Sequence, residues 1–127
     1  MNEGKIKVLL CDDSKFARAS FRNLLLKLGV DDVTEAQDGE EAVQKFLEVR
    51  PDIAFIDIEM PNTGGVDALK KIRMADPKAK AVMLSSPGTQ DCLKEALDAG
   101  TLDFLQKPVT EEGLSKFFEK HGFCATN

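Results

Sequence analysis

The chain has 127 residues, enough for one domain with a sizeable core, and its formal net charge of −5 argues against general affinity for nucleic acid or anionic membrane surfaces. No apolar stretch is long enough to span a bilayer, so we expect no membrane insertion. Three widely spaced cysteines, Cys11, Cys92 and Cys124, indicate neither a disulfide framework nor a zinc motif, and they suit a reduced, cytoplasmic protein.

Short apolar runs alternate with amphipathic segments along the chain. Residues 5–11 are mostly apolar without alternation, which predicts a central strand. Apolar residues recur at helical spacing over residues 14–29, so we expect a first helix there, ended by a glycine. Residues 33–37 predict a short second strand, and a second helix follows the Asp-Gly turn at residues 38–39.

The third apolar run, residues 53–56, is bounded by prolines and delivers Asp57 at its end. A continuous run of this length is typical of a strand buried on both faces, and therefore of a parallel sheet covered by helices. Ligands bind at the carboxyl ends of the strands in such sheets, so Asp57 is a candidate site residue. Residues 66–72 then mark a third helix, which Asp76 and Pro77 end.

Two more strands and two more helices complete the pattern. Residues 81–86 predict the fourth strand, and residues 102–106 predict the fifth. Pro87 and Gly88 are expected to break the chain after the fourth strand. The apolar positions of the fourth helix are Leu93, Ala96 and Leu97. Those of the last helix are Leu114, Phe117 and Phe118.

Five repeats of strand followed by helix predict a single α/β domain over residues 1–127. We expect a doubly wound, flavodoxin-like parallel sheet of five strands in the order 2-1-3-4-5, with five helices on its two faces. In that order the carboxyl ends of four strands meet at one crevice. The residues that these ends carry are Asp12 with Asp13, Asp57, Ser85 and Lys107.

These residue types favour phosphoryl chemistry. Unit charges about 4 Å apart in a partly shielded site repel by on the order of 4 kcal/mol, so a cation is expected among the carboxylates. Oxygen ligands suit Mg²⁺ or Mn²⁺. Lys107 adds a movable positive charge and Ser85 adds a hydroxyl donor. Asp57 is then the natural nucleophile for forming an aspartyl phosphate.

Each residue also has a simpler interpretation. Asp12 and Asp13 could cap the helix that follows them, Ser85 could bond only to backbone, and Lys107 could be a solvated surface lysine. Four independent coincidences at four strand ends are much less probable than any one of them. The combination of the four strand ends is therefore stronger evidence for a functional site than any one of these residues alone.

The ordered set of Asp12-Asp13, Asp57 in Asp-Ile-Glu-Met-Pro, Ser85-Ser86 and Lys107-Pro108 resembles the receiver domains of two-component response regulators over essentially the whole chain. Within that family the chain is similar to single-domain chemotaxis regulators and to the receiver half of chemoreceptor methylesterases. The resemblance implies a stand-alone chemotaxis or motility switch with no output domain. A histidine kinase would phosphorylate it, and its only catalysis would be transfer to its own Asp57 and autodephosphorylation.

The resemblance also implies roles for individual residues around the metal. It makes Asp57 the phosphoacceptor, and it makes Asp13, Asp57 and the Glu59 backbone carbonyl ligands of Mg²⁺, with Asp12 acting through water. Glu59 and Pro87 occupy positions that tune the lifetime of the phosphoryl group in the family. We hypothesise that the Glu59 charge hinders attacking water.

On the switch side, the resemblance makes Ser85 and Lys107 partners of the phosphoryl oxygens. Phe104 stands in the place of the family's switch aromatic and would turn inward as Ser85 moves. The Lys107–Pro108 peptide bond is expected to be cis, as in the family. The motif at residues 60–65 departs from the common Met-Pro-x-Met-Asp-Gly, and Ser85 replaces the commoner threonine, but neither departure removes a required group.

The downstream partner is expected to bind the fourth helix, the fifth strand and the fifth helix. Phe117 and Phe118 are candidates for that surface, because adjacent helical positions are not expected to face the core together. The alternative is that both rings are half-buried at the edge of the helix.

Other classes of protein fit less well. A small aspartate-nucleophile phosphatase would place its acid pair after the first strand and need a cap domain, whereas here the acids after that strand are adjacent. A flavin-binding domain would want a phosphate loop where Asp12 and Asp13 stand. A pseudo-receiver that only binds protein would not need Asp13, Asp57, Ser85 and Lys107.

Overall fold

A computed structural model describes residues 6–123 of the chain, so Cys124 and the start of the predicted first strand lie outside the described residues. Five parallel strands form one sheet in the order β2-β1-β3-β4-β5, as predicted. The strands are β1 (Lys7–Cys11), β2 (Asp32–Ala36), β3 (Ile53–Asp57), β4 (Ala81–Ser85) and β5 (Asp103–Gln106).

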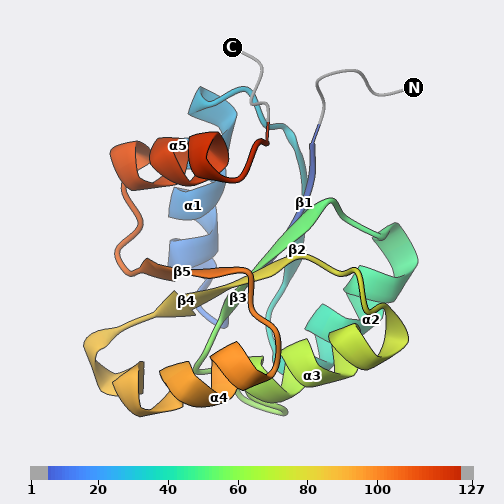
Figure 1. Cartoon of the computed structure of the whole chain (residues 1–127). Helices are drawn as coiled ribbons and strands as arrows, with labels where there is room; N and C mark the ends of the chain where they lie inside the picture. Colours follow the sequence, from blue (N-terminus) through green and yellow to red (C-terminus); the bar gives the residue numbers. More distant parts are fainter. Residues whose placement is uncertain (1–5, 124–127) are drawn as a thin grey trace.

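Helices cover both faces of this sheet (Figure 1). α1 and α5 pack on one face, and α2, α3 and α4 pack on the other. The helices are α1 (Lys15–Lys27), α2 (Gly39–Val49), α3 (Gly65–Ala75), α4 (Leu93–Asp98) and α5 (Glu111–Lys120), with a 3-10 helix, η1 (Pro87–Cys92), before α4. Within residues 6–123, no helix is both long and apolar enough to cross a membrane.

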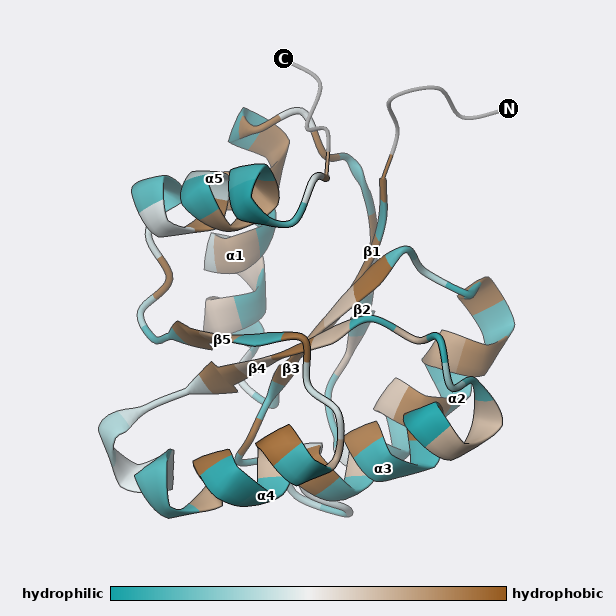
Figure 2. Ribbon diagram, viewed as in Figure 1, coloured by the Kyte–Doolittle hydropathy of each residue, from teal (hydrophilic) through white to brown (hydrophobic). Residues whose placement is uncertain are grey.

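β3 is the most deeply buried strand, and all five of its residues are buried. Its side chains alternate between the two faces, so that Ala54 and Ile56 join the core under α2, α3 and α4 while Ile53 and Phe55 join the core under α1 and α5. Figure 2 shows this centre as a band of hydrophobic strands between helices whose outer faces are hydrophilic. A continuous apolar run was therefore a valid sign of burial on both faces.

Side chains at the ends of strands start the helices that follow them. The Ser14 hydroxyl accepts a hydrogen bond from the backbone N–H of Ala17 at 3.2 Å, and the Asp38 carboxylate accepts one from Glu41 at 2.8 Å. Each bond satisfies one of the free N–H groups in the first turn of a helix. The loops after β1 and β2 are therefore short, and the residues at the ends of these two strands stay close to the sheet.

The segment after β4 differs from the prediction. Pro87 and Gly88 do not break the chain but begin η1, where the Thr89 hydroxyl accepts a hydrogen bond from the Ser86 backbone N–H at 2.9 Å. Proline suits the first turn of a helix because its missing N–H has no partner there. α4 is consequently only six residues long, and Leu97 is 61% exposed although we expected it in the apolar stripe.

The prediction that Phe117 and Phe118 lie on the surface was wrong. Their exposed fractions are 3% and 2%, and both rings meet the Phe55 ring of β3, with centroid distances of 5.6 and 6.3 Å. α5 presents a broad face to the sheet, and a large ring from β3 fills the space between the two positions. Adjacent helical residues can therefore both be buried here.

Candidate functional site

Three carboxylates gather at the carboxyl edge of the sheet. Strand register brings them together, because Cys11 pairs with Ile56 and Asp57 pairs with Leu84. Asp12, Asp13 and Asp57 each offer an oxygen atom, and these atoms all lie within 4.8 Å of one another. Asp12 and Asp57 are buried, at 2% and 6% exposed, whereas Asp13 is exposed. The predicted convergence of the first and third strand ends is confirmed.

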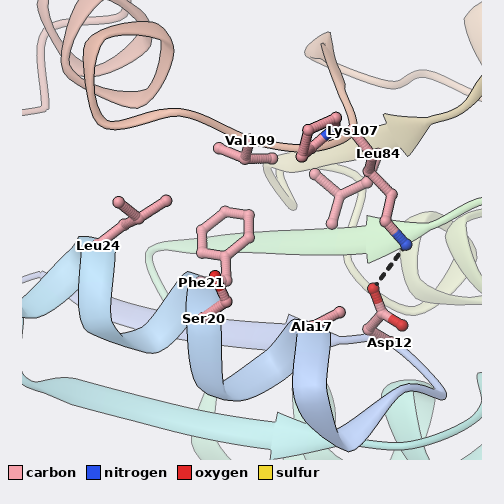
Figure 3. A pocket seen from close by; sticks show the side chains of 9 residues that line it. Asp12, Ala17, Ser20, Phe21, Leu24, Leu84, Lys107 and Val109 are labelled. Carbon is pink, nitrogen blue, oxygen red and sulfur yellow. Dashed lines mark hydrogen bonds and ion pairs between the residues drawn. The ribbon is translucent and has the colours of Figure 1, made fainter.

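Lys107 supplies the positive charge within this cluster. Its Nζ donates to Oδ2 of Asp12 at 2.9 Å and to Oδ2 of Asp57 at 3.1 Å. Figure 3 shows the lysine side chain reaching down from the end of β5 to Asp12. The Lys107–Pro108 peptide bond is cis, as predicted.

Burial and charge act against each other on the ionisation of these groups. Burial raises the pKa of Asp57 above its ordinary value, although the Lys107 ammonium opposes the rise. Burial on its own would lower the pKa of Lys107, but hydrogen bonds to Asp12 and Asp57 outweigh it and raise that pKa. The lysine therefore stays charged at neutral pH.

Backbone groups fix the two buried carboxylates. Oδ1 of Asp12 accepts from the Ser14 N–H at 2.9 Å, and Oδ1 of Asp57 accepts from the Glu59 N–H at 3.3 Å. The loop after β3 is close to Asp57, since a Cβ added at Gly65 would lie 2.1 Å from the Asp57 carbonyl oxygen. No side chain larger than hydrogen fits at residue 65 without moving the phosphoacceptor candidate.

The side chains of the other predicted site residues form no hydrogen bond to the cluster within residues 6–123. Ser85 is half-buried at the end of β4, and its carbonyl accepts from the Lys107 N–H at 2.7 Å. Phe104 lies in β5 and packs partly buried against the core under α2, α3 and α4. Glu59 and Pro87 are exposed. Among residues 6–123, no hydrogen bond joins these four side chains to the acid cluster, and their roles stay predictions.

The sequence interpretation missed Arg18, which lies on α1 beside the cluster. Nη1 of Arg18 donates to the Asp12 carbonyl at 2.6 Å, and its Nε donates to Glu35 of β2 at 2.8 Å. In the helical pattern Arg18 was simply a polar residue between apolar ones. The spacing of four residues from Ser14 did place it on the first turns of α1, but its partner in β2 depends on packing that no local pattern reveals.

A cavity of about 290 Å³ adjoins the site between α1 and the loop after β5 (Figure 3). Asp12 and Lys107 form its polar end. Its remaining walls are mostly apolar and come from α1, the end of β4 and the residues after Lys107. They are Ala17, Ser20, Phe21, Leu24, Leu84, Pro108 and Val109.

The donor set fits a hard divalent cation. Asp12, Asp13 and Asp57 offer only oxygen atoms, and the exposed side of Asp13 leaves room for waters, which Mg²⁺ retains. A cation and a charged lysine can neutralise the oxygens of a phosphoryl group, and a nearby hydroxyl can donate to one of them. Phosphoryl transfer depends mainly on such positioning and charge neutralisation.

Comparison with known proteins agrees with this geometry. The response regulator receiver domain matches residues 8–119, and the chain belongs to this family. Its acid cluster is thus an acidic pocket of the kind in which receiver domains bind Mg²⁺.

The proteins similar to this chain include a chemotaxis protein and a longer methylesterase. The chain is 42% identical to the chemotaxis protein CheY of Thermotoga maritima over 102 residues, 80% of this chain and 85% of that one. It is 40% identical over 108 residues to a protein-glutamate methylesterase/protein-glutamine glutaminase of Haloarcula marismortui, and that match covers 84% of this chain but 29% of the longer protein.

Among solved structures, the complex of CheX and CheY with BeF₃ and Mg²⁺ from Borrelia burgdorferi contains a chain of the same fold. That match has a TM-score of 0.83 and 30% identity, and it covers 91% of this chain and 89% of the other. The chain is therefore a receiver domain that resembles the CheY chemotaxis regulators.

Proposed function

We propose that the chain is a cytoplasmic switch that accepts a phosphoryl group on Asp57 from a histidine kinase and then changes its affinity for a partner protein, in chemotaxis or motility. The observation that carries the proposal is the joint position of Lys107, Asp12 and Asp57. Nζ of Lys107 lies 2.9 Å from Oδ2 of Asp12 and 3.1 Å from Oδ2 of Asp57, and both carboxylates are buried. When a phosphoryl group is attached to Asp57, the lysine would shift its hydrogen bond from a carboxylate oxygen to a phosphoryl oxygen.

The transfer step uses Asp57 as the nucleophile. An Oδ atom of Asp57 attacks phosphorus, a new O–P bond forms, and the N–P bond of a phosphohistidine breaks with its electron pair returning to the imidazole. Hydrolysis restores the free carboxylate: water attacks phosphorus, the bond between the Asp57 oxygen and phosphorus breaks, and inorganic phosphate and a proton are released. Lys107 offsets charge on the phosphoryl oxygens in both steps.

Mg²⁺, or Mn²⁺ in its place, would be held by Asp13, Asp57 and the Glu59 carbonyl, with Asp12 acting through water. When bound, the metal supplies positive charge that neutralises the phosphoryl oxygens. The burial of Asp12 and Asp57 strengthens their attraction for such an ion.

We propose that the signal leaves the site through Ser85 and Phe104. The Ser85 hydroxyl would bond a phosphoryl oxygen, and Phe104 would follow it inward. A partner would then bind the surface formed by α4, β5 and α5, on which Leu97 is exposed. Glu59 and Pro87, both exposed, would set the lifetime of the phosphoryl group.

The test is intact mass after incubation with Mg²⁺ and a small acyl phosphate. We expect the native chain to gain one phosphoryl group, to lose this gain in the presence of a chelator, and the Asp57→Asn variant to gain none. A native chain that binds Mg²⁺ yet gains no phosphoryl group would overturn the proposal and favour a pseudo-receiver. Steady turnover of unrelated phosphate esters would instead favour a phosphatase.

A further inference from the structure

Arg18 is the residue beside the acid cluster whose contacts the proposed chemistry leaves without a role. Its side chain is only 13% exposed, and its guanidinium bonds two elements at once. Nη1 donates to the Asp12 carbonyl of the β1–α1 loop, and Nε donates to Oε1 of Glu35 on β2. Arg22, one turn along α1, donates to the other oxygen of Glu35 at 2.6 Å and is 41% exposed.

The carbonyl that Arg18 binds belongs to the peptide unit between Asp12 and Asp13. The other polar groups of Asp12 are also bonded: its N–H donates to the Ala36 carbonyl at 3.1 Å, and its carboxylate accepts from Ser14 and Lys107. For Asp13, no hydrogen bond is found within residues 6–123. The Cα–Cβ direction of Asp13, and with it the region that its carboxylate can reach, therefore depends on the peptide plane that precedes it.

We propose that Arg18 is a positioning residue that fixes the Asp12–Asp13 peptide plane and thereby aims the Asp13 carboxylate at the divalent cation. Glu35 fixes the guanidinium by accepting from Nε, so that the Nη1 donor has one direction. The Glu35 carboxylate suits this task because, although burial raises its pKa, hydrogen bonds from Arg18 and Arg22 lower it overall and keep it charged. The inference rests on the proposed metal site.

Electrostatics alone predicts the opposite sign, which makes the inference testable. Removing a positive charge near three carboxylates strengthens their attraction for a cation. If Arg18 acts by orientation, its removal instead weakens cation binding, as loss of an outer-shell partner does. Arg22 carries the same charge and shares Glu35 but has no bond to the loop, so it is the matched control.

The experiment is calorimetric titration of Mg²⁺ into the native chain and into the Arg18→Gln, Arg18→Lys and Arg22→Gln variants. Circular dichroism first measures the melting temperature of each protein, and every titration is run well below that temperature. We expect Arg18→Gln to raise the Mg²⁺ dissociation constant by about tenfold. Arg18→Lys, which keeps the charge and one donor group, should lie between Arg18→Gln and the native chain. Arg22→Gln should leave the constant unchanged or lower it slightly.

The outcomes separate the inference from the proposed function. Binding by Arg18→Gln that equals or exceeds native binding overturns the role of Arg18 while the switch stands. An equal loss in Arg18→Gln and Arg22→Gln also overturns it, since both variants would then act through Glu35. If Arg18→Gln does not fold, Arg18→Lys serves in its place, and a Mg²⁺ dissociation constant equal to that of the native chain then overturns the role of Arg18. A native chain that binds no Mg²⁺ removes the proposed metal site and this inference together.

Discussion

α4 and α5 flank the same edge of the sheet but are attached to it very differently. α5 has ten residues, an N-cap bond from Gly113 to Thr110, acidic residues in its first turn and three buried side chains. α4 has six residues, no side-chain cap, and Ala96 as its one buried side chain. Helix stability in proteins comes mainly from packing of an apolar face, so α5 is held firmly and α4 weakly.

The difference indicates which part of this edge can move. Local opening of a protein concentrates where few apolar contacts are made, and α4 with η1 is such a segment. α5, by contrast, is continuous with the aromatic cluster of Phe21, Phe55, Phe117 and Phe118. A switch that acts through this edge would displace α4 relative to a fixed α5.

The largest expected change in the free energy of unfolding is on α5, the firmly held helix. We expect Phe117→Ala to lower the free energy of unfolding by about 3–5 kcal/mol, because it opens a cavity against the Phe55 ring. Urea unfolding followed by circular dichroism measures this, since the chain has no tryptophan or tyrosine. Lys116→Ala, on the exposed side of α5, is the control and should change stability by less than about 0.5 kcal/mol.

Hydrogen exchange should separate the two helices directly. We expect the amides of α4 to exchange at least about tenfold faster than those of Phe117 and Phe118 in the native state, a difference of about 1.4 kcal/mol in opening free energy. Exchange measured residue by residue with NMR tests this. Equal protection in α4 and α5 would show that the weak packing of α4 has no dynamic consequence.

Asp103 ties the end of α5 to β5. Its carboxylate accepts from the Phe104 N–H at 2.7 Å and lies 2.8 Å from Nε2 of His121. Burial raises the pKa of Asp103, but the hydrogen bonds from His121, Phe104 and Lys120 outweigh it and lower that pKa. The stabilisation is therefore complete above the ordinary pKa of about 4 and is lost as the pH falls through the lowered value.

We accordingly expect Asp103→Asn to lower the free energy of unfolding by about 1 kcal/mol near neutral pH, and by progressively less as the pH drops below about 4. Denaturant midpoints across that pH range measure the change. Asp98→Asn removes an exposed carboxylate from α4 and should show no such trend. A deficit for Asp103→Asn that persists undiminished in acid would contradict the assignment.

The smallest effect belongs to Leu97. Because its side chain is 61% exposed on α4, we expect Leu97→Ala to change the free energy of unfolding by less than about 0.5 kcal/mol. Leu114→Ala on α5, where the side chain is fully buried, should cost about 2–5 kcal/mol in the same assay. Similar losses in the two variants would remove the contrast between the helices.

Local patterns in the sequence were sufficient for the strands and helices, and with a strand order taken by analogy they also led to the acid cluster. The continuous apolar run before Asp57 indicated burial on both faces, and the order of the strands then brought Asp12, Asp57 and Lys107 to one edge. These conclusions depend on short-range signals and on the general geometry of parallel sheets. The strand order itself rested on analogy with flavodoxin-like folds.

What the sequence concealed depends on packing between distant segments. Whether Phe117 and Phe118 share the core depends on the Phe55 ring beneath them. The bond from Arg18 to Glu35 joins residues 17 positions apart on different elements, and nothing in either local pattern marks it. Pro87 and Gly88 looked like a break because a Pro-Gly pair marks turns and loops, although proline also suits the first turn of a helix.

The ion pair between Lys107 and Asp12 joins residues 95 positions apart, and it has a consequence for biosynthesis. Closing so long a loop becomes favourable only when the intervening strands are already in place. During synthesis the two acids after β1 emerge first and the lysine emerges near the end. A nascent or truncated chain that stops before β5 would carry the clustered acids without their internal cation, so competence to accept a phosphoryl group would report that the whole sheet has folded.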